Sequence, residues 1–144
     1  MSGLRTAATA LALLLLAGCG GGTLSVLHSR GKPTGDGDAE VAIKNSSGNS
    51  IEKLYVAKTE AVDHAREAGA SPGSSADEAL WGDDQLGNAG IPEGSTWKGL
   101  HLGAARYDLL LVAHDHREQL VKHVDLKSGG RYVLEVNDDW AMGR

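Results

Sequence analysis

From residue 39 onward, short apolar runs alternate with short polar turns, and this pattern restricts the possible folds more than any other feature. The runs are rich in Val, Ile, Leu and Tyr, and Gly, Asn, Asp and Ser separate them, as is typical of β-strands. The turns SSGN, DHRE and KSGG predict sharp reversals between neighbouring strands. The six predicted strands are EVAIKN, SIEKLYVAK, STWKGLHL, ARYDLLLVAH, QLVKHVDL and RYVLEV.

Side-chain alternation is clearest in the last two of these runs. It places Leu120, Lys122, Val124 and Leu126 on one face of their strand, and Tyr132, Leu134 and Val136 on one face of the next. One side of each strand is therefore mostly apolar and the other mostly polar, a pattern that favours antiparallel sheets packed in layers. The sequence predicts an all-β fold: a single antiparallel β-sandwich of six to seven strands over residues 39–144.

Residues 59–80 interrupt the strand pattern, because they carry helix-forming residues in place of β-branched ones. Gly69 is suited to end a helix, since glycine adopts a left-handed conformation at low cost. Ser75 followed by Glu78 forms a capping box, which predicts a short helical turn that ends near Gly82. We expect a short helical insertion between the second and third of the six strands.

The N-terminus has the organisation of a secretory signal. Arg5 precedes an apolar run over residues 7–17, in which Thr9 is the only polar residue. A membrane-spanning helix needs about 20 apolar residues, whereas a signal peptide needs about 7 to 15. This segment therefore predicts export followed by cleavage.

The stretch LAGC, from Leu16 to Cys19, resembles the lipobox of bacterial lipoproteins. That resemblance implies lipidation of Cys19, removal of residues 1–18 as the signal peptide and acylation of the new amino group. A cysteine that carries lipid needs no disulfide partner, and Cys19 is the only cysteine of the chain. The alternative is an ordinary signal peptide with a cysteine at this position by chance.

Residues 19–38 are rich in glycine and show no sustained periodicity, so we interpret them as a flexible, lipidated tether. LSVL, within this segment, is long enough for a short edge strand but is not included in the predicted fold. Gly20 stands where some diderm bacteria place an inner-membrane retention Asp. The lipoprotein resemblance therefore implies anchoring at the periplasmic face of the outer membrane.

A looser resemblance covers residues 107–136. A Tyr soon after a Gly, a polar turn, a strand that ends in VDL, a Gly turn and a last apolar strand resemble transthyretin-like surface modules. AIKNSSGNSIEKLYVAK and WGDDQLG are similar to stretches of small bacterial secreted β domains. These resemblances imply a fold and no particular activity.

WGDDQLG, residues 81–87, carries the candidate binding residues Trp81, Asp83 and Asp84. An aromatic ring beside two carboxylates could form an edge that binds a sugar or a cation. Alternatively, Trp81 and Leu86 plug an open end of the sandwich while Asp83 or Asp84 caps the turn between them. We favour the structural interpretation.

The remaining chemistry-bearing residues give no metal, cofactor or catalytic prediction. His114 and His116 are two residues apart, but DHRE predicts a turn that separates them, and His101 and His123 complete a site only in favourable strand orders. The run from Asp36 to Asp38 lacks the spaced ligands of an EF-hand. No GxSxG, HExxH, P-loop or GxGxxG motif is present, so we expect no enzyme.

Charge further limits the partners. Nineteen acidic residues against fourteen basic ones give a net charge of -5, and the basic residues are scattered along the sequence, which argues against nucleic acid. We expect a membrane-anchored envelope lipoprotein that acts as a non-catalytic structural or binding module for an envelope protein or a cell-wall glycan. A metal-carrying accessory subunit is the alternative, followed by a small hydrolase.

Overall fold

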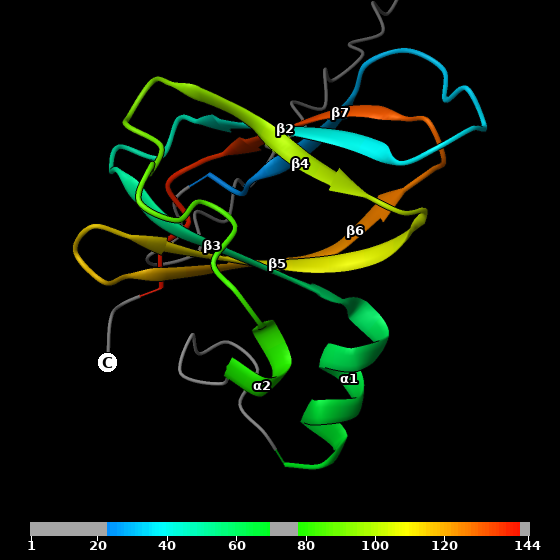
Figure 1. Ribbon diagram of the computed structural model, residues 1–144. Coiled ribbons are helices and arrows are strands. Elements are labelled where there is room, and N and C mark those ends of the chain that lie inside the picture. The colour runs from blue at the N-terminus through cyan, green and yellow to red at the C-terminus, as the bar shows by residue number, and fades with distance from the viewer. Residues whose placement is uncertain (1–22, 70–77, 142–144) are drawn as a thin grey trace, which may run out of the picture.

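The computed structural model describes residues 23–69 and 78–141, which form two β-sheets and two helices arranged in layers (Figure 1). Sheet A has the strand order β1-β7-β2-β4, and sheet B has the order β3-β5-β6. The helices α1 and α2 lie on the side of sheet B that faces away from sheet A. The elements are β1 (Val26–Ser29), β2 (Ala39–Asn45), β3 (Ile51–Lys58), α1 (Thr59–Glu67), α2 (Glu78–Trp81), β4 (Thr96–Leu102), β5 (Ala105–Ala113), β6 (Glu118–Leu126) and β7 (Arg131–Val136).

The six predicted runs all form strands, and the prediction of a mostly β chain is confirmed. Two of the predicted turns lie where the sequence places them. After β5 the Ala113 N–H donates to the Arg117 carbonyl and the His116 N–H donates to the Ala113 carbonyl, and before β7 the Gly130 N–H donates to the Lys127 carbonyl. Turn residues thus set the strand boundaries as expected from their local preferences.

The tether interpretation of residues 19–38 is wrong over one segment, because β1 lies within it. β1 pairs with β7 in an antiparallel register that joins Leu27 to Leu134. Leu27 is half-buried against the main core, while its neighbours Val26 and His28 point outward. In a strand of only four residues, the alternation of side chains is too short to be recognised in the sequence. The segment forms a strand because it pairs with the otherwise free edge of β7.

The expectation of purely antiparallel sheets is also wrong at one pair. β2 and β7 run parallel, with Val41 opposite Tyr132 and Ile43 opposite Leu134. Both strands lie in the interior of sheet A, between β1 on one edge and β4 on the other. After β2 the chain passes through sheet B and returns as β7, which runs beside β2 in the same direction. A short hairpin joins only antiparallel strands.

The main hydrophobic core draws side chains from both sheets. Sheet A contributes fully buried residues such as Ile43 and Leu134, and sheet B contributes Leu54, Leu109 and Leu111. Burial of such side chains contributes roughly 1.5–3 kcal/mol each. This core therefore joins the two layers.

A second hydrophobic cluster lies on the outer face of sheet B, beneath the helices. Val62 of α1 and Trp81 of α2 pack there with Tyr55, Leu110 and Val112. As predicted, two helices, α1 and α2, lie between β3 and β4, and Gly69 follows α1 with a left-handed φ of 92°. The predicted capping residue Ser75 lies outside the described residues.

A β-bulge in β6 changes the predicted alternation of that strand. Lys122 and His123 both stand opposite Asp108, and His123 has a φ of 58°. Leu120 consequently packs with the outer cluster while Val124 packs in the main core, so the prediction that they share a face is wrong. The buried Asp108 carboxylate fixes the bulge, because its Oδ1 accepts from the His123 N–H (3.0 Å) and the Thr59 hydroxyl (2.7 Å).

Candidate functional site

The structure gives the sequence-predicted site around Trp81 mainly structural contacts. Trp81 is 2% exposed and packs in the outer cluster of sheet B, so its ring is not available to stack on a ligand. It covers a sheet face and does not plug an end of the two layers, whereas Leu86 packs in the main core. Cys19, the predicted lipidation site, lies outside the described residues.

The two aspartates of this stretch differ in their environment. Asp84 Oδ1 accepts hydrogen bonds from the N–H groups of Leu54 (2.9 Å) and Leu86 (3.0 Å), which ties the loop to β3. This is the turn-capping role that the structural interpretation gives to Asp83 or Asp84. Asp83 is exposed, and its carboxylate has no partner among the described residues. Trp81, Asp83 and Asp84 therefore do not converge on one surface.

The histidines are divided among several parts of the fold. His114 and His116 share the turn after β5, where His114 contacts Glu52 and His116 has a φ of 68°, while His28 and His101 line the outer face of sheet A. Within residues 23–69 and 78–141, no group of three or more His, Cys, Asp or Glu side chains is placed to hold a metal ion. In the same part of the chain, no helix is both long and apolar enough to cross a bilayer.

A more open site lies on the outer face of sheet A, which sequence reasoning missed. A groove of about 780 Å³ crosses this face, and we call it the sheet A groove. Across this face the strand register aligns three rows of side chains, and all of them except Val26 line the groove. The rows are Val26, Glu135, Lys44 and Thr96 in the first, His28, Val133, Ala42 and Lys98 in the second, and Arg131, Glu40 and His101 in the third.

Side-chain size along these rows forms the groove. Val133 and Ala42 in the middle row are small, whereas the outer rows carry long charged side chains. Gly99, the extra residue of a bulge in β4, also lines the groove. A Cβ atom at Gly99 would stand 2.7 Å from the Trp97 ring, so only glycine fits without displacing that indole. The groove therefore has a low floor between two charged walls.

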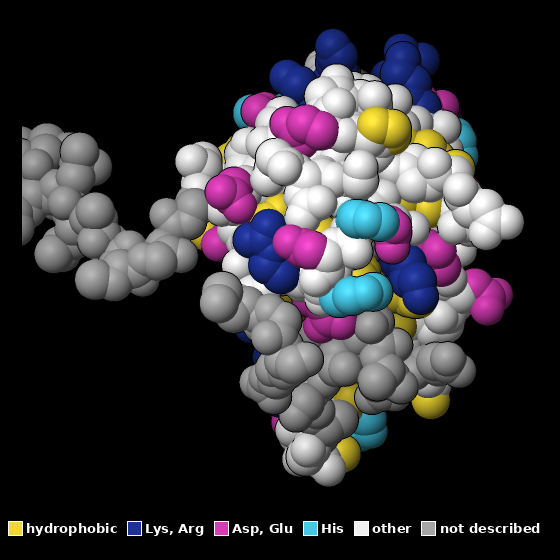
Figure 2. All heavy atoms as spheres, turned by 90° about the vertical axis from the view of Figure 1, so that its left-hand side faces the viewer, with side chains coloured by type: hydrophobic (Ala, Val, Ile, Leu, Met, Phe, Trp, Pro, Cys, Tyr) yellow, Lys and Arg dark blue, Asp and Glu magenta, His cyan; other side chains and the backbone are white. Residues whose placement is uncertain are grey.

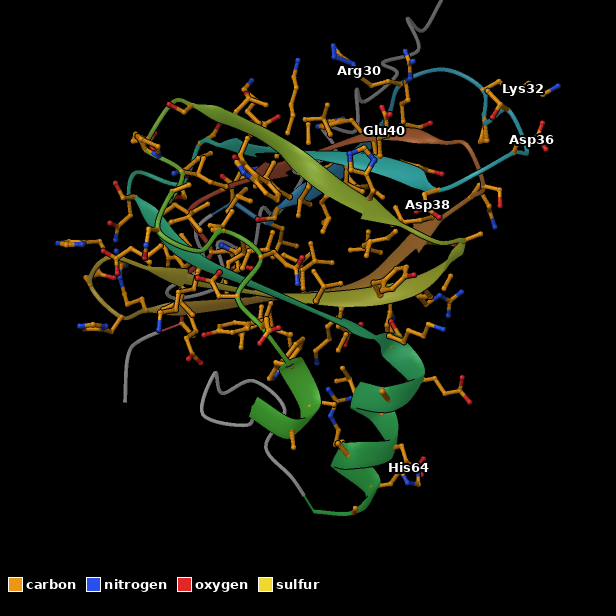
Figure 3. All side chains as sticks on the ribbon, viewed as in Figure 1. Arg30, Lys32, Asp36, Asp38, Glu40 and His64 are labelled. Atoms are coloured by element: carbon orange, nitrogen blue, oxygen red, sulfur yellow. The ribbon has the colours of Figure 1, made fainter. Side chains whose placement is uncertain are left out.

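The charge of the groove is opposite to that of the whole chain. Four cationic side chains line it (Arg30, Lys44, Lys98 and Arg131), against the two carboxylates Glu40 and Glu135. Figure 2 shows Lys and Arg gathered at the end of the molecule that carries sheet A, and Figure 3 places Arg30 there, with His64 at the opposite end.

Two long contacts with the groove carboxylates leave most of this positive charge available. His28 Nε2 lies 3.4 Å from Glu135 Oε2, and Arg131 Nε lies 3.8 Å from Glu40 Oε2. The side chains of Arg30, Lys44 and Lys98 have no acidic partner in the described part of the chain. The arrangement suits an anionic group, which would replace water around three unpaired cations.

A second hollow, of about 840 Å³, lies between α1 and the ends of β5 and β6. It contains three cationic side chains and four carboxylates, and the Lys127 ammonium is already 3.2 Å from the Asp125 carboxylate. Its charges nearly cancel, so it offers less to a charged ligand than the sheet A groove does.

Comparison with protein-family models, with curated proteins and with solved structures finds no match for this chain. What the groove can bind therefore has to follow from its own side chains. The sequence did carry part of the signal, since Glu40, Ala42 and Lys44 alternate with the buried Val41 and Ile43. The missing information was that β2 lies beside β7 and β4.

Proposed function

We propose that this chain is a lipid-anchored module of a bacterial cell envelope, and that it binds an envelope partner without catalysis. The observation that carries this proposal is the LAGC stretch behind an apolar run of signal-peptide length. The attachment is to Cys19, and the predicted location is the periplasmic face of the outer membrane. One acyl chain holds a protein only marginally, whereas two or more anchor it stably.

The short distance between Cys19 and the first strand supports this role. Only residues 20–25 separate Cys19 from β1, and a fully extended chain covers at most about 3.3–3.6 Å per residue. The domain would thus stay within about 25 Å of the lipid. We also propose that the two layers form a β-sandwich related to transthyretin-like modules, an arrangement that the core shared by both sheets supports.

The sheet A groove supports a binding role. It is exposed, its floor consists of Val133, Ala42 and Gly99, and its walls carry charged groups that can hold a ligand in place. Val133 and Ala42 belong to strands paired on both sides, and Gly99 belongs to the edge strand β4, which pairs with β2, so partner binding on this floor needs no large rearrangement.

Fatty-acid labelling in a bacterial host tests the anchor. The wild-type chain should incorporate labelled palmitate and fractionate with membranes. The Cys19→Ser chain lacks the acceptor sulfur, so it should carry no label and should not fractionate with membranes. Label retained by the Cys19→Ser chain would refute lipidation at this residue. Wild-type protein found without label would refute the anchored function as a whole.

A further inference from the structure

We propose that the sheet A groove binds an acidic glycan chain of the cell wall, a sugar polymer that carries carboxylates. This inference rests on the proposed function, which brings the domain to the envelope, and it adds the class of partner. It rests on the shape, the charge and the donor and acceptor pattern of the groove.

The shape of the groove fits a chain in preference to a compact ligand. The middle row runs from His28 on β1 to Lys98 on β4, and these two strands are the edges of sheet A. Four strands about 4.8 Å apart give a floor of roughly 14 Å, plus the width of the edge side chains. A ligand can therefore enter at one edge and leave at the other.

The unpaired cations require negative charge on that chain. Lys44 and Lys98 stand on neighbouring strands, and Arg30 follows β1 at the other edge. The cations thus lie along the length of the groove and not at one point. Carboxylates repeated along a polymer match that spacing better than a single anion does.

The walls also suit sugar hydroxyl groups. A hydroxyl group both donates and accepts hydrogen bonds, while a guanidinium or ammonium only donates and a carboxylate only accepts. Arg131 beside Glu40 offers both kinds of group within one wall, and Lys44 beside Glu135 offers both in the other. Alternating donors and acceptors are what a polyhydroxylated chain needs.

A peptide fits the same groove less well. Peptides commonly bind by adding a strand at a free sheet edge or by placing apolar side chains in pockets. The middle of the groove floor lies on β7 and β2, whose backbone groups are already paired with neighbouring strands, and the free edges of sheet A, β1 and β4, lie only at the two ends of the groove. Val133, Ala42 and Gly99 form a shallow floor without a deep apolar pocket.

Calorimetric titration of the full chain in neutral detergent tests the proposal, with polygalacturonate oligomers as the acidic glycan and dextran as the neutral one. The wild type should bind polygalacturonate and not dextran. Affinity should fall as salt rises, since the Debye length shortens to about 3 Å at 1 M. Lys44→Glu combined with Lys98→Glu should weaken binding about tenfold or more, because two attractive contacts become repulsive.

The matched control is Lys53→Glu combined with Lys122→Glu. These lysines are exposed on β3 and β6 of sheet B, and the double substitution changes the net charge by the same amount. It should leave affinity within about twofold of the wild type. Equal weakening by the two pairs would overturn the proposal, because overall charge and not the groove would then be responsible. Unchanged thermal midpoints in both variants show that neither pair affects folding.

Other outcomes separate the possible failures. No binding of polygalacturonate by a chain that incorporates palmitate would overturn the glycan inference and leave the anchor intact. If the chain binds polygalacturonate but incorporates no palmitate, the anchor is refuted and the glycan inference stands. A further arm uses vesicles with and without phosphatidylglycerol. If the groove lysines matter for the anionic vesicles and not for the glycan, the face docks on the membrane and the inference is overturned.

Discussion

The two sheets expose opposite kinds of outer face. On sheet B the outer face carries Leu110 and Val112, and two helices cover it with Val62 and Trp81. On sheet A the outer face carries the charged rows of the groove, and no helix described in the structure packs on it. The difference shows that α1 and α2 have a structural task, which is to cover the apolar outer face of sheet B, while the charged outer face of sheet A carries no such cover among the described helices.

The strand sequences explain why the faces differ. The stretch LLLVA in β5 is buried without interruption, as expected for a strand covered on both sides. β2 and β7 alternate between buried and more exposed residues, as expected for strands covered on one side. Substitutions on the outer face of sheet B should therefore alter stability, and those on the outer face of sheet A should alter binding.

The largest expected effect is that of Trp81→Ala. The ring is almost fully buried between α2 and sheet B, and truncation of a buried Trp typically lowers the free energy of unfolding by about 3–5 kcal/mol. Urea unfolding measures this loss. The matched control Asp83→Ala, two residues on and exposed, should change it by under about 0.5 kcal/mol. Similar midpoints for the two variants would mean that the helices do not stabilise sheet B.

The next effect is that of Asp108→Ala, also on the covered face. Without the carboxylate, the His123 N–H and the Thr59 hydroxyl lose their acceptor, and each buried unsatisfied group costs about 1–3 kcal/mol. Asp108→Asn keeps one acceptor oxygen and should lose less. Glu40→Ala, the counterpart on the exposed face of sheet A, should have an effect under about 0.5 kcal/mol. Equal losses for Asp108→Asn and Asp108→Ala would contradict the hydrogen-bond explanation.

A smaller effect is expected for Leu27→Ala at the edge of sheet A. Leu27 is half-buried against the main core, so we expect a loss of about 1–2 kcal/mol in unfolding free energy, less than for a fully buried Leu. Val26→Ala is the control, since Val26 is 44% exposed and points outward. An unchanged midpoint for Leu27→Ala would restore the tether interpretation for this segment.

Local signals in the sequence were enough to find most of the strands and the helical insertion. The runs from EVAIKN to RYVLEV have the right composition and clear turns at their ends, and Gly69 marks the end of α1. The features that were missed depend on contacts between distant segments. The pairing of β1 with β7, the parallel pairing of β2 with β7 and the bulge opposite Asp108 are all of this kind.

The candidate site also has one feature that local sequence predicts and one that depends on contacts between distant segments. Asp84 acts as a turn cap, a role that the sequence could suggest because Asp commonly caps loops. The sheet A groove was not predictable, because Lys44, Lys98 and Arg131 are far apart in the sequence and meet only through the strand order. A list of scattered basic residues gave no sign that three strands bring them to one face.

The smallest effect concerns His114, at the end of β5 in sheet B, where the chain is exposed. The hydrogen bond from its ring to the Glu52 carboxylate, and then the charge of Glu52, raise the pKa of His114 above its ordinary value. The imidazolium form is thus favoured in the folded state. Its contribution to stability is complete below the pKa of the unfolded chain and is lost as the pH rises through the folded-state pKa. Because the two side chains are 75% and 44% exposed, salt and water weaken the pair and the change in stability should be slight.

NMR titration of the His114 ring should give a midpoint above about 6.5, the usual value for histidine, and Glu52→Gln should lower that midpoint. The same midpoint in wild type and Glu52→Gln would show that the contact does not persist in solution, and would leave the exposed end of sheet B without a charged contact at His114.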